Sequence, residues 1–242
     1  MRTIIIGDGH LGWAIAAAAS DRGERTPILG RPTMGRHDPV AFEGVDLVID
    51  ASRGDAVATN VRAALDGGVR RFVIATTGWA ADRDALDGEL RAHGAAAVVA
   101  ANFSLGVNLF ARLVEVATDL YGAIDGFDPY LVEWHRRAKA DRPSGTALEL
   151  AARIAARHPG LSGAGDLETV SIRAGSSPGM HLVGFDAAGE TVELRLTARD
   201  RTAYGVGVLA ATDWLRRAPR ASGIHTFDPV VDELLARRAA AA

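Results

Sequence analysis

Residues 132 to 151, VEWHRRAKADRPSGTALELA, concentrate the side chains that are best suited to acid–base chemistry. Glu133, His135 and Lys139 stand close together, with two arginines between the histidine and the lysine. Positive neighbours lower the pKa of a histidine and help it to release a proton near neutral pH. The run is therefore either a solvated basic loop or a site where a small anion is held and protonated, and the residues alone leave both readings open.

The turn Pro143-Ser144-Gly145-Thr146 follows and leads into a predicted helix. Thr146 and Glu149 have the spacing of a capping box, which predicts Thr146 as the N-cap residue. Such a turn offers backbone N–H groups and hydroxyls at a helix N-terminus, an arrangement suited to a carboxylate. We therefore expect this segment to bind an anionic small molecule.

A second candidate site lies near the N-terminus, where the β-branched run Thr3 to Ile6 predicts a buried strand. The strand ends at GDGHLG, which matches G-x-G-x-x-G and precedes an alanine-rich helix. Gly7 would form the tight turn, Gly9 would let backbone approach a pyrophosphate, and Gly12 would let helix and strand pack closely. The motif predicts a dinucleotide site, and the alternative is a glycine turn that binds nothing.

The end of the second predicted strand bears on which dinucleotide binds. Enzymes that use NAD commonly carry an acidic residue there, which accepts a hydrogen bond from the ribose 2′-hydroxyl. This chain instead has Leu29-Gly30-Arg31-Pro32. Because a guanidinium suits a 2′-phosphate, we expect NADPH, with NADH use left open. The alternative is that Arg31 merely lies in solvent.

The expected elements fall into two groups. Five strands joined by helices indicate a parallel sheet with helices on both faces, and they are predicted at 3–6, 26–32, 45–52, 70–79 and 95–104. Later segments indicate a mixed α+β half, with helices at 105–122, 146–158 and 202–218, a strand at 128–135, and a hairpin turning at 186–189. The predicted fold class is α/β, a Rossmann-type parallel-sheet nucleotide domain joined to an α+β domain with a mixed sheet.

Composition excludes several classes of protein. The 242 residues carry a net charge of −3, which argues against bulk electrostatic binding of nucleic acid. There is no cysteine, so disulfides and thiolate metal sites are excluded. The histidines show no ligand spacing, so we predict no metal, and His181 is expected to be structural. No apolar stretch is long enough for a membrane helix, and we expect a cytoplasmic protein.

Several motifs together resemble the dihydrodipicolinate (4-hydroxy-tetrahydrodipicolinate) reductase family. VEWHRRAKADRPSGTAL is similar to its signature E-x-H-H-x-x-K-x-D-x-P-S-G-T-A. VIATTGW (73–79) resembles V-I-G-T-T-G-F, and AANFSLGVNLF (100–110) resembles A-N-F-S-x-G-V-N-L. IDAS at 49–52 and the segments SIRAG, GMHLVGF and ARDRTAYGVG follow the family in the same order.

The resemblance implies a nucleotide domain at 1–102, completed by 203–242, and a substrate-binding and oligomerisation domain at 103–202. It implies hydride transfer from NADPH or NADH to a cyclic imine with two carboxylates, in lysine and diaminopimelate biosynthesis, by a homo-oligomer, a tetramer. His135 and Lys139 fall on catalytic positions. The implied substrate contacts are Arg136, Ser144, Gly145, Thr146 and Thr77. The implied cofactor contacts are Gly7, Asp8, Gly9, His10, Leu11, Gly12, Arg31, Ala51, Ser52, Ala75, Thr76, Thr77, Asn102, Phe103 and Arg201.

The chain departs from the family at positions that matter for specificity. Arg136 replaces the second histidine of the signature, and it could bind a carboxylate but not act as an acid near neutral pH. Arg142 stands where a small residue is usual, and Ala51 replaces a phenylalanine. Two alternatives therefore stay open, a reductase of another anionic cyclic imine and a non-catalytic nucleotide-binding protein.

Overall fold

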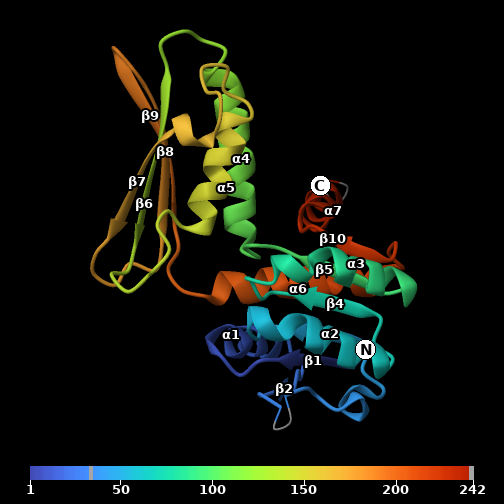
Figure 1. Ribbon diagram of the computed structural model, residues 1–242. Helices are drawn as coiled ribbons and strands as arrows, with labels where there is room; N and C mark the ends of the chain where they lie inside the picture. The colour runs from blue at the N-terminus through green and yellow to red at the C-terminus, as the bar shows by residue number, and fades with distance from the viewer. Residues whose placement is uncertain (33–34, 240–242) are drawn as a thin grey trace. The chain divides into compact units, whose positions relative to one another are not determined.

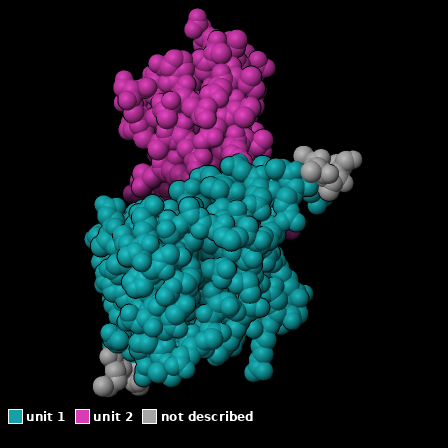
Figure 2. All heavy atoms as spheres, turned by 90° about the vertical axis from the view of Figure 1, so that its right-hand side faces the viewer, with its two compact units in different colours: residues 1–105, 201–242 teal, residues 106–200 magenta. Residues whose placement is uncertain are grey.

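The computed structural model describes residues 1–32 and 35–239. The chain forms two compact units, one of residues 1–105 and 201–242 and one of residues 106–200 (Figure 2). No helix among the described residues is both long and apolar enough to cross a membrane.

The first unit is built on a six-stranded parallel sheet in the order β10-β5-β4-β3-β1-β2 (Figure 1). Its strands are β1 (Thr3–Ile6), β2 (Ile28–Leu29), β3 (Leu47–Asp50), β4 (Arg71–Ile74), β5 (Ala96–Val99) and β10 (Gly223–His225). Ile4 and Ile6 lie in one hydrophobic core, whereas Ile5 lies in another on the opposite face. Successive side chains of a strand point to opposite faces, so a strand that is apolar throughout requires cover on both.

Helices supply that cover. One face packs against α2 (Val57–Asp66) and α3 (Arg83–Ala92) through side chains such as Val61 and Leu86. The other packs against α1 (His10–Ser20), α6 (Thr202–Arg217) and α7 (Asp228–Ala239). Gly207 of α6 lies so close to the backbone of the segment after β5 that an added Cβ would be 1.6 Å from the carbonyl oxygen of Phe103.

The parallel sheet with helices on both faces confirms the predicted fold class, but several element boundaries were wrong. Strand β1 has its predicted bounds, whereas β2, β3, β4 and β5 are shorter than the segments that predicted them. The sequence prediction missed β10, since a three-residue strand carries no periodicity. Helix α1 begins at His10, inside the GDGHLG motif that was predicted to precede it, and its C-cap is Asp21.

The second unit is a four-stranded mixed sheet in the order β7-β6-β8-β9, with two helices on one side (Figure 1). The strands are β6 (Asp128–His135), β7 (Glu168–Arg173), β8 (Met180–Ala187) and β9 (Glu190–Thr197), and the helices are α4 (Leu105–Tyr121) and α5 (Gly145–Ala155). Their shared core includes Val114, Leu131, Leu150 and Phe185. The hairpin predicted at 186–189 is confirmed as the antiparallel turn between β8 and β9.

The start of α5 differs from the predicted capping box. The N-cap is Ser144, whose side-chain oxygen accepts a hydrogen bond from the N–H of Ala147 at 3.2 Å. Thr146 therefore lies inside the first turn, and the predicted Thr146 cap was wrong. Serine fits the cap position because its hydroxyl reaches the N–H three residues on while its own backbone stays extended.

Candidate active site

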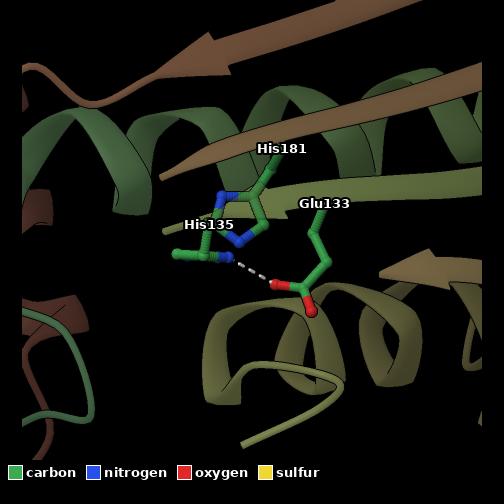
Figure 3. A group of neighbouring side chains, drawn as sticks. All are labelled: Glu133, His135 and His181. Carbon is green, nitrogen blue, oxygen red and sulfur yellow. Dashed lines mark ion pairs between the residues drawn. The ribbon is translucent and has the colours of Figure 1, made fainter. Parts of the chain in front are cut away.

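Strand register gathers a buried polar cluster in the second unit. Glu133 of β6 pairs with His181 of the antiparallel β8 and with Ser171 of the parallel β7, while His135 pairs with Arg173. Glu133 and His135 are two residues apart on a strand, so both point to the helix-covered face. Figure 3 shows the His135 ring directed at a carboxylate oxygen of Glu133, with the His181 ring beside it.

Glu133 is fully buried and ionised. Its Oε1 accepts hydrogen bonds from the backbone N–H of Ser144 at 2.9 Å, the hydroxyl of Ser171 at 2.6 Å and the guanidinium of Arg173 at 2.7 Å. Its Oε2 lies 2.8 Å from Nδ1 of His135. Burial raises the pKa of Glu133, but the hydrogen bonds from Ser144, Ser171 and Arg173 outweigh it and lower the pKa to about 2.

His135 is almost buried, with 8% of the residue exposed. Burial is the main cause that lowers its pKa, Glu133 raises it, and Lys139 and Arg173 lower it further. The sequence led us to expect cationic neighbours as the chief cause, and that expectation was wrong because the ring lies inside the sheet–helix core. Gly179 borders the other ring nitrogen, and a Cβ added there would lie 3.0 Å from Nε2.

His181 is the neighbour that sequence reasoning assigned to structure alone. It is 6% exposed, its ring lies 5.3 Å from that of His135, and its Nε2 is 3.3 Å from the hydroxyl of Ser144. Burial lowers the pKa of His181 to about 4, so the ring is neutral at physiological pH. A pattern could have indicated this cluster, because Glu133 and His135 are polar residues on the face that Leu131 marks as inward.

The loop after β6 carries the remaining charged residues. Lys139 Nζ lies 2.7 Å from the Asp141 carboxylate, and its hydrogen bond lowers the pKa of Asp141. A hydrogen bond from the backbone of Gly145 lowers the same pKa further. Arg136 is exposed. Arg142, which stands where the family usually has a small residue, donates to the carbonyl oxygen of Ser171 on β7 at 2.8 Å. Its side chain is therefore held against the sheet.

The first unit contains a pocket of about 630 Å³ at the glycine loop. Six of the predicted cofactor residues line it, namely Gly7, Asp8, Gly9, Arg31, Ala51 and Ser52. His37, Arg53, Thr59 and Asn60 line it as well and were not predicted.

The glycines of this loop have the geometry that a dinucleotide requires. A Cβ on Gly12 would lie 2.0 Å from the carbonyl oxygen of Gly7, whereas one on Gly9 would meet no atom within 4 Å. Gly12 therefore allows the close approach of helix and strand, and Gly9 presents open backbone to the pocket. The residues present thus fit a dinucleotide whose phosphates lie at the N-terminus of α1.

Asp50, at the end of β3, binds two residues that line the pocket, Ser52 and Asn60, and was not predicted. It is 1% exposed. Its carboxylate accepts hydrogen bonds from Ser52, from Thr76 at 2.6 Å and from Asn60 at 2.8 Å. Two predicted cofactor residues, Ser52 and Thr76, therefore hold their hydroxyls on a buried carboxylate. A single acidic residue at the end of a strand leaves no periodic pattern in the sequence. Two of its partners, Asn60 and Thr76, come from other segments of the chain.

The other predicted cofactor and substrate residues of this unit lie outside the pocket lining. Phe103 is buried against Phe227, and Asn102 donates to the hydroxyl of Tyr204 at 3.4 Å. Thr77 and Arg201 are exposed. His10, Leu11, Gly12, Ala75 and Thr76 also lie outside the lining.

A parallel sheet whose glycine loop borders a dinucleotide-sized pocket, combined with a separate unit that carries a buried acid–base pair, defines the class of two-domain, pyridine-nucleotide-dependent oxidoreductases. Comparison with known proteins agrees. The N-terminal domain of dihydrodipicolinate reductase matches residues 10–103, and the C-terminal domain matches residues 106–230. The chain belongs to the dihydrodipicolinate reductase family.

Individual relatives span nearly the whole chain. The 4-hydroxy-tetrahydrodipicolinate reductase of Archaeoglobus fulgidus is 31% identical over 232 residues, covering 90% of this chain and 88% of the relative. That of Christiangramia forsetii is 29% identical and covers 97% and 99%. The solved structure of dipicolinate-bound dihydrodipicolinate reductase from Paenisporosarcina sp. TG-14 superposes with a TM-score of 0.72 at 20% identity, covering 93% and 97%.

Proposed function

We propose that this chain reduces 4-hydroxy-tetrahydrodipicolinate to tetrahydrodipicolinate with a pyridine nucleotide, a step of lysine and diaminopimelate biosynthesis. The single observation that carries the proposal is the buried Glu133–His135 pair beside Lys139, set within the family's signature segment. Relatives that bear this activity in their names match nearly the full chain.

The first unit, in this proposal, is the nucleotide domain. Gly7, Asp8, Gly9, Ala51 and Ser52 would hold the cofactor, since they line the pocket. Bound NAD(P)H supplies the hydride. Arg31 also lines the pocket, and among the described residues no carboxylate forms an ion pair with it, which supports NADPH over NADH.

The second unit would bind and protonate the substrate. The contacts of Asp141 show that Lys139 and the backbone of Gly145 can hold a carboxylate. A carboxylate of the substrate would take the same kind of contact, with the Thr146 segment at the helix N-terminus and exposed Arg136 adding further donors. Because the hydroxyl and N–H of Ser144 already bind within the protein, this residue would act by fixing the cradle.

His135 is the proposed proton donor. Its Nδ1 faces Glu133, so Nε2 is the nitrogen left for the substrate. A positioned acid of this kind contributes on the order of 10²–10⁴-fold to rate. Lys139 would hold negative charge near the reacting atoms, an electrostatic role that is strongest in a site sheltered from water.

Turnover tests the proposal directly. NADPH oxidation is followed by its absorbance with freshly generated 4-hydroxy-tetrahydrodipicolinate, for the wild-type chain and for His135→Gln. We expect turnover by the wild type and a loss of about 100-fold or more in the variant. Tight NADPH binding with no turnover at high enzyme concentration would contradict the proposal and favour a non-catalytic nucleotide-binding protein.

Arg136 favours a second candidate, a reductase of another anionic cyclic imine. It is exposed and replaces the family's second histidine, so it could select a different anion. If so, Arg136→His combined with Arg142→Ala would raise activity on 4-hydroxy-tetrahydrodipicolinate. Arg142→Ala would also remove the hydrogen bond from Arg142 to the carbonyl oxygen of Ser171 and could disturb the loop. The single Arg136→His variant leaves that bond intact, so a change in its activity would report substrate specificity alone.

A homotetramer is also proposed. The sheet face away from α4 and α5 carries partly exposed apolar side chains, including Trp134, Val170 and Ile172. An apolar sheet face of this kind is typical of a surface that is covered by another copy. Light scattering coupled to size-exclusion chromatography would report a fourfold subunit mass, and a monomer at micromolar concentration would refute this assembly.

A further inference from the structure

We propose that Glu133 is a positioning residue for His135, which it holds in the Nδ1–H tautomer and whose protonated form it stabilises, while Arg173, Ser144 and Ser171 keep its carboxylate in place. This inference deepens the proposed function and rests on it for its catalytic consequence. It can be tested without substrate, because it concerns the protonation of one ring.

The two oxygens of Glu133 have separate tasks. Oε1 takes all three hydrogen bonds, from Ser144, Ser171 and Arg173. Oε2 and the His135 Nδ1, 2.8 Å apart, have no other hydrogen-bonding partner among the described residues. Because Oε2 of an ionised carboxylate can only accept, Nδ1 must carry the hydrogen.

This arrangement determines which proton the ring can give away. In the protonated ring both nitrogens carry hydrogen, and Nδ1–H stays on Glu133. The Nε2–H bond is the one that breaks, its proton passes to the substrate, and the electron pair stays on the ring. The neutral product is the Nδ1–H tautomer that Glu133 already favours, so the ring need not turn.

Other charged groups face His135 from each neighbouring element. Glu133 lies on its own strand, Arg173 on β7, His181 on β8, and Lys139 and Asp141 on the following loop. Glu133 and Asp141 raise the pKa of His135, whereas Lys139 and Arg173 lower it. Glu133 is the anion in direct contact, and its removal leaves a ring that faces mostly cations.

A cation site is the competing interpretation of this cluster. Ligand atoms of Glu133, His135 and His181 all lie within 4.8 Å of one another. The guanidinium of Arg173 lies 2.7 Å from the same carboxylate, and Lys139 lies nearby. A divalent ion would add to this positive charge at close range, so the cluster suits proton chemistry better than metal binding.

The test uses Glu133→Gln in the full chain, with Glu115→Gln as the matched control. Glu115 is a partly buried, ion-paired glutamate of α4 that pairs with Arg153 at 2.7 Å. In Glu133→Gln the amide oxygen can still accept the three hydrogen bonds, and the amide NH₂ then faces Nδ1. Nitrogen-15 NMR of the free protein, with the His135 signal assigned through His135→Gln, reports the tautomer and the titration.

We expect the neutral His135 ring to change to the Nε2–H tautomer in Glu133→Gln, and its pKa to fall. The kcat should drop about 10-fold near neutral pH, with its decline toward alkaline pH beginning at lower pH and with partial recovery under acidic conditions. Glu115→Gln should match the wild type in every readout. Arg173→Gln should raise the pKa of His135, and it serves as the second variant if Glu133→Gln does not fold.

Three outcomes would overturn the inference. An unchanged tautomer and titration in folded Glu133→Gln would do so, as would an equal loss of kcat at every pH. Zn²⁺ binding to the wild type that is lost in both Glu133→Gln and His181→Ala would also do so. Failure of the wild type to turn over substrate refutes the proposed function alone, because the NMR result is independent of it.

Discussion

Acid pH should destabilise the second unit through Glu133, and the size of the effect follows from its burial. The pKa of about 2 in the folded protein, against an ordinary value of 4.5, means that folding favours the ionised form. At about 1.4 kcal/mol for each unit of difference, this amounts to about 3 kcal/mol of stability at neutral pH. Glu133 has no exposed surface, so solvent screening does not reduce the figure.

The sign follows from the lowered folded-state pKa. The contribution is fully present above about pH 4.5, where the unfolded carboxylate is also ionised, and it is lost as pH falls toward 2. Between pH 4.5 and pH 3 the wild type should lose about 2 kcal/mol through this group. Glu133→Gln, which has no proton to take up, should lack that loss.

Urea unfolding followed by circular dichroism at pH 7, 4.5, 3.5 and 3 would measure the difference. The free-energy gap between wild type and Glu133→Gln should narrow by about 2 kcal/mol over the acid range. Glu115→Gln accounts for the loss of an ion-paired glutamate elsewhere in the same unit. A gap that stays constant from pH 7 to pH 3 would refute the assignment of Glu133 as a buried anion held by hydrogen bonds.

Three further predictions concern single side chains. Gly179→Ala should lower kcat at least about 10-fold, because the new Cβ would press on Nε2 of His135 and the backbone φ of +152° disfavours a side chain. NADPH binding, measured by fluorescence titration, should not weaken. An unchanged kcat would contradict this prediction. Arg31→Ala should weaken NADPH binding about 10-fold and leave NADH binding unaltered in calorimetry, and equal weakening of both would show that Arg31 does not contact a 2′-phosphate. Ser144→Ala should cost about 1 kcal/mol in urea unfolding through loss of the α5 cap, with Ser144→Asn as the control that restores a cap.

Local sequence was sufficient for most of the architecture. The alternation and β-branched runs predicted most strands of both sheets, since a strand buried on two faces is largely apolar, as Ile4–Ile6 is. The glycine loop was predictable because sterics leave no alternative to glycine at Gly12, whose added Cβ would lie 2.0 Å from the Gly7 oxygen. The capping error at Thr146 arose because Ser144 and Thr146, two positions apart, both carry a hydroxyl that could cap the helix. The sequence does not show which of the two precedes the first helical residue, which is Gly145.

The sequence by itself determined most of the elements, the glycine loop and the placing of His135 at the end of a strand. Only tertiary structure decided what His135 touches. Glu133 meets Arg173 and His181 through the register of three strands, and these residues lie about 40 to 48 positions apart along the chain. Such partners depend on how strands pair, and pairing is set by the whole core rather than by any short pattern. For the same reason Asp50 binds Asn60 of α2 and Thr76 after β4 through one buried carboxylate, which no local spacing could reveal.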